Sequence, residues 1–301
     1  MTSAGSHWEI GVMRPGGNPV QNLAKALFEM DLYDFEEDEA IFHLQATLKR
    51  SGLGLVEAIK QSEIEEGANL LIVVDQFEEL FRFSRSGQSQ DEQAAAFVKL
   101  LLEASRQSEI PIYVAITMRS DYIGDCAQFP DLTESVNEGE YLVPRLKRDQ
   151  RRTAIEGPIK VAGGEIAPRL TQKLLNDFGN DPDQLPILQH ALMRMWDKWV
   201  ENRDPDDSLD LQHYENIGGM EGALSQHADE VLEESGSDSE KLATQKLFQA
   251  LTERGGDNRG IRRPTRLADL SEIIGVELDV LKAIVERFRK PGRTFLMPPV
   301  E

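Results

Sequence analysis

The chain has 301 residues, a formal net charge of −20 and a single cysteine. Its 40% hydrophobic and 29% charged residues are typical of a globular protein that is long enough to bury a sizeable core. The negative charge argues against non-specific binding to nucleic acids, since that binding depends on lysine and arginine. Because Cys126 is the only cysteine, no intrachain disulfide can form. The sequence has neither a signal peptide nor an apolar run that could span a membrane, so we expect a cytoplasmic protein.

Strand-like and helix-like segments alternate in the first half of the chain. Apolar runs that predict strands lie at residues 8–14, 70–74, 110–117 and 141–143. Helical patterns lie between them, at residues 20–30, 40–63, 76–83 and 91–107. The run Leu70–Val74 is unbroken, which is typical of a strand buried on both faces of a parallel sheet. The alternation predicts an α/β domain over residues 1–146, with a parallel sheet flanked by helices.

Strand signals almost vanish after residue 146. Helices are predicted at residues 148–156, 168–178 and 185–200, followed by a proline- and acid-rich linker at residues 202–210. Further helices are predicted at residues 220–234, 239–253, 269–274 and 276–288, with a basic turn at 262–266 and a short strand or hairpin at 293–297. We therefore expect a helical domain over residues 147–203 and a second, mainly helical domain over residues 204–301.

Charged residues lie at or just beyond the ends of two predicted strands. Asp75 ends the strand at residues 70–74, and Arg119 comes two residues after the strand at residues 110–117. Open α/β sheets bind ligands at the carboxyl ends of their strands, where an aspartate can hold Mg²⁺ and an arginine can grip phosphate oxygens. Two simpler interpretations stay open. Asp75 could cap a helix that begins at Gln76, and Arg119 could be a surface residue paired with a nearby aspartate.

Four separated motifs resemble those of the STAND-class NTPases, and within that class the "novel STAND" branch. They are DQFEELF at 75–81, MRSDY at 118–122, LVPRLKRDQRRTAIEGP at 142–158 and LPILQHALMRMW at 185–196. The resemblance implies that Asp75 is the Walker B aspartate, that Arg119 is a sensor residue and that Pro186 is the lid proline near the nucleotide base. ATP and Mg²⁺ are the implied cofactors. A P-loop NTPase core, a helical lid and a winged-helix-like domain are the implied order.

The phosphate-binding loop of this class, G-x-x-x-x-G-K-[ST], does not occur, because the chain contains no Gly-Lys pair. In the class, the loop and the strand before it precede the segment that resembles residues 8–19, and that strand lies between those matching residues 110–117 and 141–143. We therefore expect an internal fragment of a larger switch protein, or a decayed version of one, with an incomplete core that would bind ATP weakly and could not hydrolyse it alone. Gln76 stands where many P-loop ATPases carry a catalytic glutamate, so Glu78 or Glu79 would have to activate water.

The resulting hypothesis is an ATP-dependent signalling switch module of the kind found in bacterial signalling and defence proteins. Its expected partners are a nucleotide and the sensor and effector domains of a larger parent chain, with oligomerisation possible. The alternative is a nucleotide-independent scaffold or protein-interaction module with a degenerate site. Binding of nucleic acid through the basic cluster at residues 259–266 is the least favoured hypothesis, given the net charge.

Overall fold

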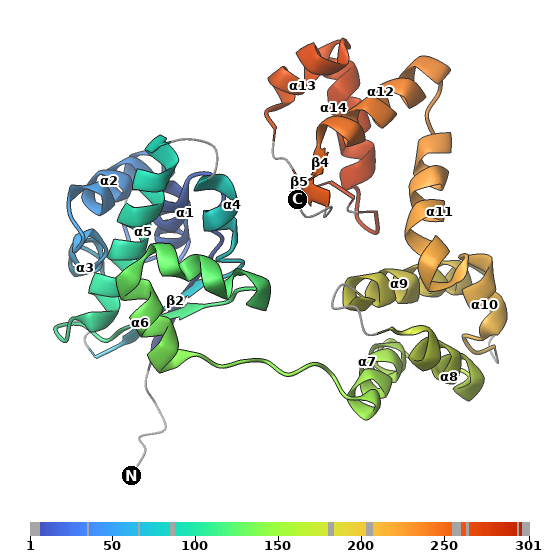
Figure 1. Ribbon diagram of the computed structural model, residues 1–301, viewed down its shortest axis with the longest axis horizontal. Helices are drawn as coiled ribbons and strands as arrows, with labels where there is room; N and C mark the ends of the chain where they lie inside the picture. Colours follow the sequence, from blue (N-terminus) through green and yellow to red (C-terminus); the bar gives the residue numbers. More distant parts are fainter. Residues whose placement is uncertain are drawn as a thin grey trace. The chain divides into compact units, whose positions relative to one another are not determined.

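The chain divides into two units, Met1–Pro144 and Arg145–Glu301 (Figure 1). The computed structural model describes residues 7–34, 36–65, 67–84, 88–179, 184–202, 207–254, 260–262, 265–293 and 295–296. Within the described part of the chain, no helix combines the length and the apolar character that a membrane crossing requires.

The first unit is built on a three-stranded parallel sheet in the order β1-β2-β3. Its strands are β1 (Trp8–Met13), β2 (Asn69–Val74) and β3 (Ile112–Ile116). They confirm the strands predicted at residues 8–14, 70–74 and 110–117. Met13 pairs with Val74, and Val74 pairs with Ile116, so the three strands end in one row. This register brings the three residues that follow the strands to the same edge of the sheet.

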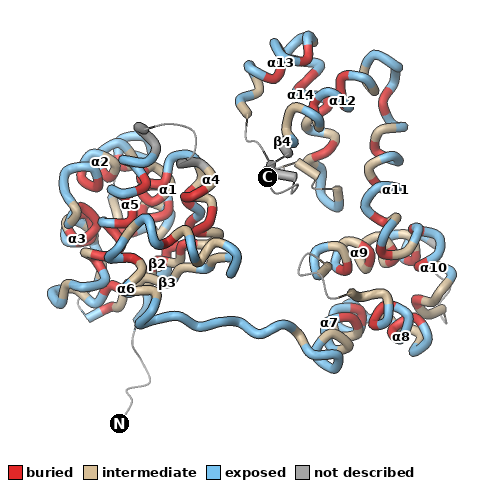
Figure 2. The backbone as a smooth tube through the Cα atoms, viewed as in Figure 1, coloured by how far each residue is buried: buried red, intermediate tan, exposed pale blue. Residues whose placement is uncertain are grey.

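Helices cover one face of this sheet. They are α1 (Pro19–Phe28), α2 (Glu37–Arg50), α3 (Gly54–Lys60), α4 (Glu79–Ser84), α5 (Gln88–Arg106), the 3-10 helix η1 (Ser120–Gln128) and α6 (Pro130–Gly139). Buried residues concentrate where α1, α5 and β2 meet (Figure 2). Gly11 of β1 leaves room for the side chain of Met30, which follows α1, because a Cβ atom there would lie 2.8 Å from Met30 Sδ.

The other face of the sheet is apolar and largely open, which corrects the prediction that residues 70–74 are buried on both sides. Along β2, fully buried residues alternate with half-buried ones. The open face carries Trp8, Ile10, Val12 and Tyr113, all of which are exposed. The rings of Trp8 and Tyr113 lie 5.1 Å apart across the sheet. Both faces of a parallel sheet are usually covered, whereas the described residues of the first unit leave this apolar face uncovered.

The strand predicted at residues 141–143 does not form. Residues 140–147 have no regular secondary structure, and the side chains of Tyr141, Leu142 and Val143 are exposed. A strand needs a hydrogen-bonded neighbour, and none of the described strands pairs with this segment. Pro144, which follows it, has no N–H to donate. Since β3 pairs only with β2 among the described strands, the expected strand between β3 and residues 141–143 has no confirmation here.

The second unit is mainly helical, and its predicted helices form. In chain order it contains α7 (Arg148–Val161), α8 (Pro168–Asp177), α9 (Gln184–Asn202), α10 (Leu211–Asn216), α11 (Gly219–Glu233), α12 (Asp238–Ala250), β4 (Thr252–Arg254), β5 (Gly260–Arg262), α13 (Leu267–Ile274) and α14 (Leu278–Arg289). Strands β4 and β5 form an antiparallel hairpin that the sequence did not predict. The hairpin precedes the last two helices, whereas a strand or hairpin was expected after them. Residues 295 and 296 of that expected segment form a bend, and residues 294 and 297 lie outside the described residues.

Two hydrophobic cores stabilise the second unit. The first is formed by α7 to α10 and the start of α11, and it contains Leu188 and Met195 of α9 as predicted. It also buries Leu209, which lies within the predicted linker, and Tyr214, which follows it, so that linker does not end the core. The second core begins at Val231 near the end of α11. One helix thus contributes to both cores, and the division at residues 203 and 204 stays a prediction.

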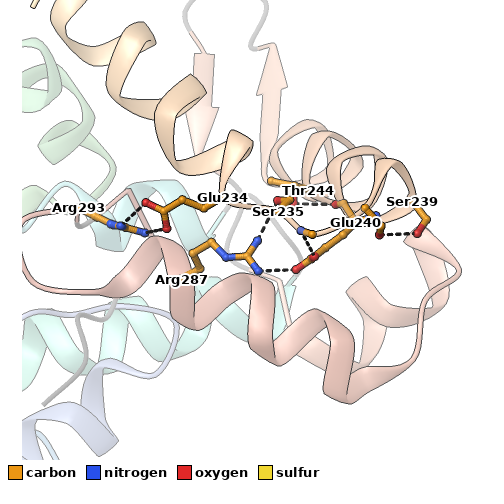
Figure 3. A network of polar contacts seen from close by, with 9 residues as sticks. Glu234, Ser235, Ser239, Glu240, Thr244, Arg287 and Arg293 are labelled. Carbon is orange, nitrogen blue, oxygen red and sulfur yellow. Dashed lines mark hydrogen bonds and ion pairs between the residues drawn. The ribbon is translucent and has the colours of Figure 1, made fainter.

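A polar network joins the turn after α11 to the last helix (Figure 3). Arg287 of α14 donates to Ser235 Oγ at 2.9 Å and to Glu240 Oε1 at 2.5 Å. Arg293 makes a two-pronged pair with Glu234, at 2.5 and 2.7 Å. Bidentate pairs of this kind combine charge with fixed geometry. The network ties the α11–α12 turn to the C-terminal helix. It does not test the winged-helix prediction, and part of the basic turn at residues 262–266 lies outside the described residues.

Candidate functional site

Three polar side chains stand in a row at the carboxyl edge of the sheet. Arg14 follows β1, Asp75 follows β2 and Thr117 follows β3. Thr117 Oγ1 donates to Asp75 Oδ1 at 2.7 Å, and Arg14 Nε donates to Asp75 Oδ2 at 3.1 Å. The hydrogen bond from Thr117, assisted by the positive charge of Arg14, lowers the pKa of Asp75 below its ordinary value. Asp75 is therefore held as a carboxylate between a hydroxyl and a guanidinium.

Asp75 is not the cap of a helix at Gln76. Residues 75–78 form turns and α4 begins only at Glu79. Gln76 adopts a left-handed backbone conformation with φ of 55°, which is unusual for a residue other than glycine. Its backbone N–H donates to Thr117 Oγ1 at 3.2 Å. Its side-chain amide is oriented so that both of its polar atoms are satisfied: the nitrogen donates to Glu79 Oε1 at 3.2 Å, and the oxygen accepts from Arg14 Nη2 at 3.3 Å.

The loop after β1 closes over these residues. The backbone N–H of Gly16 donates to Glu79 Oε2 at 3.1 Å. Asn22 of α1 anchors the loop, since its side-chain amide donates to the carbonyl oxygens of Arg14 and Pro15 at 3.2 and 2.9 Å. Gly16 has a φ of 55°, and a Cβ atom there would lie 2.9 Å from Asn22 Nδ2. The left-handed backbone favours glycine at this position, and a larger residue would push against the Asn22 amide that anchors the loop.

The two predicted water-activating carboxylates have different surroundings. Glu79 begins α4, is half-buried and joins the network of Gly16 and Gln76. Glu78 is buried, and its Oε2 atom has no hydrogen-bond partner among the described residues. A buried carboxylate oxygen without a partner carries a desolvation penalty, so it usually signals strain or a missing ligand. Of the two, Glu79 is the one whose hydrogen bonds connect it to the residues around Asp75.

Arg119 lies two residues beyond the row and is engaged locally. Its Nε and Nη2 atoms donate to the two carboxylate oxygens of Asp121, at 3.0 and 3.2 Å. This is the pairing with a nearby aspartate that the simpler interpretation expected. About half of the side chain is exposed, so the pair can exchange for another anion at small cost. The sensor role of Arg119 stays a prediction.

Pro186 belongs to the second unit, in the first turn of α9. It lines an apolar cavity of about 590 Å³ between α7 and α9. Ile155 and Pro158 of α7 and Leu188 and Trp196 of α9 are among its other walls. Apolar clefts of several hundred Å³ are typical of small-molecule sites. The role of Pro186 beside a nucleotide base stays a prediction.

The row at the sheet edge fits Mg²⁺ that is carried by a phosphate group. Asp75 and Thr117 offer hard oxygen ligands, and proteins usually hold Mg²⁺ through one or two carboxylates together with phosphate oxygens and water. Within the described ranges, no group of three or more His, Cys, Asp or Glu residues could hold a metal ion. The oxygens of Asp75 and Thr117 therefore fit a Mg²⁺ ion that is also held by the phosphates of a nucleotide. They do not fit a site in which protein residues supply every ligand of the ion.

The sequence pattern points to Asp75 and Glu79 but not to Arg14, Gly16 and Thr117. Arg14 directly follows a predicted strand, as Asp75 does, so the rule that selected Asp75 applies to it as well. Thr117 is the last residue of the strand that the sequence predicts. The pairing of these residues depends on the register of three strands, which the sequence alone does not determine.

Comparisons with known proteins identify a family. A search of curated proteins gives no significant match. Two structures of ORC2 from Aeropyrum pernix, the ADPNP–ADP complexes and the ADP form, each have a TM-score of 0.48 at 14% and 13% identity; they cover 93% and 94% of this chain and 79% and 70% of theirs. A mutant of RuvB from Thermotoga maritima has a TM-score of 0.32 at 14% identity, covering 92% of this chain and 77% of its own. Similarities at this level indicate nothing about function. The model of novel STAND NTPase 1 matches residues 1–296, nearly the whole sequence, and the chain therefore belongs to this family.

Proposed function

We propose that the chain is the nucleotide-responsive part of an ATP-dependent signalling switch, with Asp75 as the ligand of Mg²⁺. The observation that carries this proposal is the row of Arg14, Asp75 and Thr117 at the carboxyl ends of three adjacent parallel strands. Ligands bind open α/β sheets at this edge. Membership of an NTPase family supports the same assignment.

Each residue of the site has a proposed role. Asp75 holds the ion, and Thr117 orients its carboxylate. Glu79 is the better candidate than Glu78 for orienting a water molecule, because it shares contacts with Gln76 and Gly16. Arg119 would leave Asp121 to contact the terminal phosphate. Bound Mg²⁺ would neutralise phosphate charge and position the phosphates.

In the second unit, we propose that the helices around Pro186 act as a lid and that the last helices act as a winged-helix-like clamp. The apolar cavity beside Pro186 would take the adenine base. The phosphate-binding loop would come from outside these 301 residues, since the sequence has no Gly-Lys pair. Sensor and effector domains of a parent chain, and an oligomer, are the proposed partners. Nucleotide binding would shift the population between closed and open states.

A nucleotide-independent scaffold is the second candidate function, and one observation favours it. Both carboxylate oxygens of Asp75 are satisfied by Thr117 and Arg14 without any ligand. In that case the row would be a structural lock on the ends of the strands, and the chain would respond to no nucleotide.

Nuclear magnetic resonance of the isotope-labelled full chain tests the proposal at both places separately. Mg²⁺–tripolyphosphate should shift the amides of Gly16, Gln76 and Thr117, and adenosine alone should shift residues around Pro186. We expect ATP–Mg²⁺ to bind in the millimolar range or more weakly, about −4 kcal/mol, because the backbone donors of a phosphate-binding loop are lacking. Asp75→Asn, which removes the charge and keeps the shape, should abolish the Mg²⁺-dependent shifts.

The two candidate functions predict different spectra. A scaffold with a degenerate site predicts that neither the unsubstituted chain nor Asp75→Asn shows a shift of the amide signals at the sheet edge. A micromolar dissociation constant for ATP–Mg²⁺ by calorimetry would contradict the expectation that the phosphate-binding loop is lacking.

A further inference from the structure

The loop at residues 14–17 contacts both carboxylates that the proposed function uses. Arg14 Nε donates to Asp75 Oδ2 at 3.1 Å, and the N–H of Gly16 donates to Glu79 Oε2 at 3.1 Å. Gln76 lies between these contacts and bonds to both Arg14 and Glu79. One short segment thus covers the metal-ligating residue and the candidate water-orienting residue at once.

The contact between Arg14 and Asp75 is suited to exchange. Side-chain exposure is 49% for Arg14 and 35% for Asp75, so water screens the pair and its net stabilisation is small. Thr117 holds the other oxygen of Asp75 at 2.7 Å, so the carboxylate would keep its orientation if Arg14 left. A divalent cation attracts a carboxylate more strongly than a guanidinium does, because it carries twice the charge at a shorter distance.

We propose that the loop at residues 14–17 is a latch, in which Arg14 occupies Asp75 until a divalent metal ion displaces it. The inference rests on the proposed function, because it takes Asp75 as the metal ligand. Displacement breaks the Arg14–Asp75 pair. Asn22 keeps the carbonyl oxygens of Arg14 and Pro15 in place, so the loop opens at Gly16, which releases Glu79 from the N–H of Gly16. The freed guanidinium then faces the phosphate oxygens that arrive with the metal, and its planar donors suit that anion. Arg14 is thus a positioning residue that couples metal binding to the exposure of Glu79.

The test follows Mn²⁺ as a paramagnetic probe in the isotope-labelled full chain. Mn²⁺ at Asp75 broadens the amide signals of Gly16, Gln76 and Thr117, and this local readout is independent of any hydrolysis. Removing the competing cation in Arg14→Gln should lower the Mn²⁺ concentration for half-broadening by about two- to fivefold, the range expected for an exposed ion pair. Arg14→Lys, which keeps the charge, should shift it less. Arg50→Gln removes the same charge at the exposed end of α2 and should leave the value unchanged.

Failure of the latch and failure of the site give different results. If Asp75→Asn abolishes the broadening but Arg14→Gln leaves the half-broadening concentration unchanged, the site stands and the latch is wrong. If Asp75→Asn leaves the broadening at these amides intact, the metal is not at Asp75 and the proposed function itself fails. Mg²⁺ added to the unmodified chain should also accelerate hydrogen exchange of the Gly16 amide, and unchanged exchange would overturn loop opening.

Discussion

The open face of the sheet should make the chain self-associate, and two substitutions should weaken that association. Trp8, Ile10, Val12 and Tyr113 keep 42%, 54%, 59% and 50% of their surface exposed on one side of β1 and β3. Complete burial of a large aliphatic side chain is worth about 1.5–3 kcal/mol, so half-exposed residues leave roughly 1 kcal/mol each, or about 4 kcal/mol per copy. Two copies meeting face to face would gain about 8 kcal/mol, which is comparable to the cost of association.

The balance predicts a weak, concentration-dependent association. Ile10→Thr with Val12→Thr keeps β-branched residues in β1 while it makes the face more polar. We expect a loss of about 1 kcal/mol per copy, or about 2 kcal/mol per dimer, which raises the dissociation constant roughly 30-fold. Sedimentation velocity over a concentration series measures this change. Val161→Thr, at a valine of α7 that is 90% exposed, is the matched control and should change nothing.

A clear result would refute the reasoning. The unsubstituted chain would have to stay monomeric at every concentration and melt in one sharp cooperative transition, with the amides of β3 strongly protected from hydrogen exchange. That outcome would mean that the sheet is covered and that its edge is paired in solution. If the unsubstituted and the doubly substituted chains had equal dissociation constants, the contact would instead lie on another surface.

Three further predictions concern stability. Gly54→Ala should cost about 1–3 kcal/mol in chemical denaturation, because a Cβ atom would lie 2.6 Å from a backbone carbonyl oxygen of α2, whereas Gly139→Ala, in open space, should stay within about 0.5 kcal/mol. Burial lowers the pKa of His227 from 6.5 to about 4, so the unfolded chain binds the proton more readily than the folded chain does. The free energy of unfolding should therefore fall by about 2 kcal/mol between about pH 7 and about pH 5. In urea titrations, His227→Gln should reduce this dependence on pH. Arg287→Met removes two charge-assisted hydrogen bonds and should cost about 2 kcal/mol in thermal denaturation, whereas Lys282→Met, whose ion pair is exposed, should cost less than about 0.5 kcal/mol.

Local sequence patterns were sufficient for most elements. The strand at residues 70–74 and the helix α9 have strong, uninterrupted signals, and both form as predicted. The hairpin of β4 and β5 has only three residues in each strand, too few for a periodic pattern. The segment 141–143 shows the opposite error, because its apolar run predicted a strand although the structure provides no neighbouring strand among the described residues. Short elements depend on partners, and a single sequence does not name those partners.

The candidate site could be predicted only one strand at a time. Asp75 stands out because an unbroken aliphatic run precedes it, whereas Arg14 follows a strand whose apolar run is interrupted by Glu9 and Gly11 and so gives a weaker signal. Thr117 is a usual strand residue, and nothing in its neighbours marks it as a partner of Asp75. Their meeting follows from the parallel register, in which Met13, Val74 and Ile116 share one row.

The position of Asp75 also separates the two candidate functions on physical grounds. A structural lock needs only to satisfy a carboxylate, and a buried threonine pair or a backbone amide would do so without a charge. Here the partner on one side is Arg14, a cation with 49% of its side chain exposed, which adds little stability. Thr117 fixes one carboxylate oxygen of Asp75 at 2.7 Å, whereas exposed Arg14 holds the other. If Arg14 leaves, that second oxygen becomes available to a ligand and the strand ends stay in place. A scaffold has no need of this exposed charge pair, whereas a site that must accept a metal ion and release it again is well served by it.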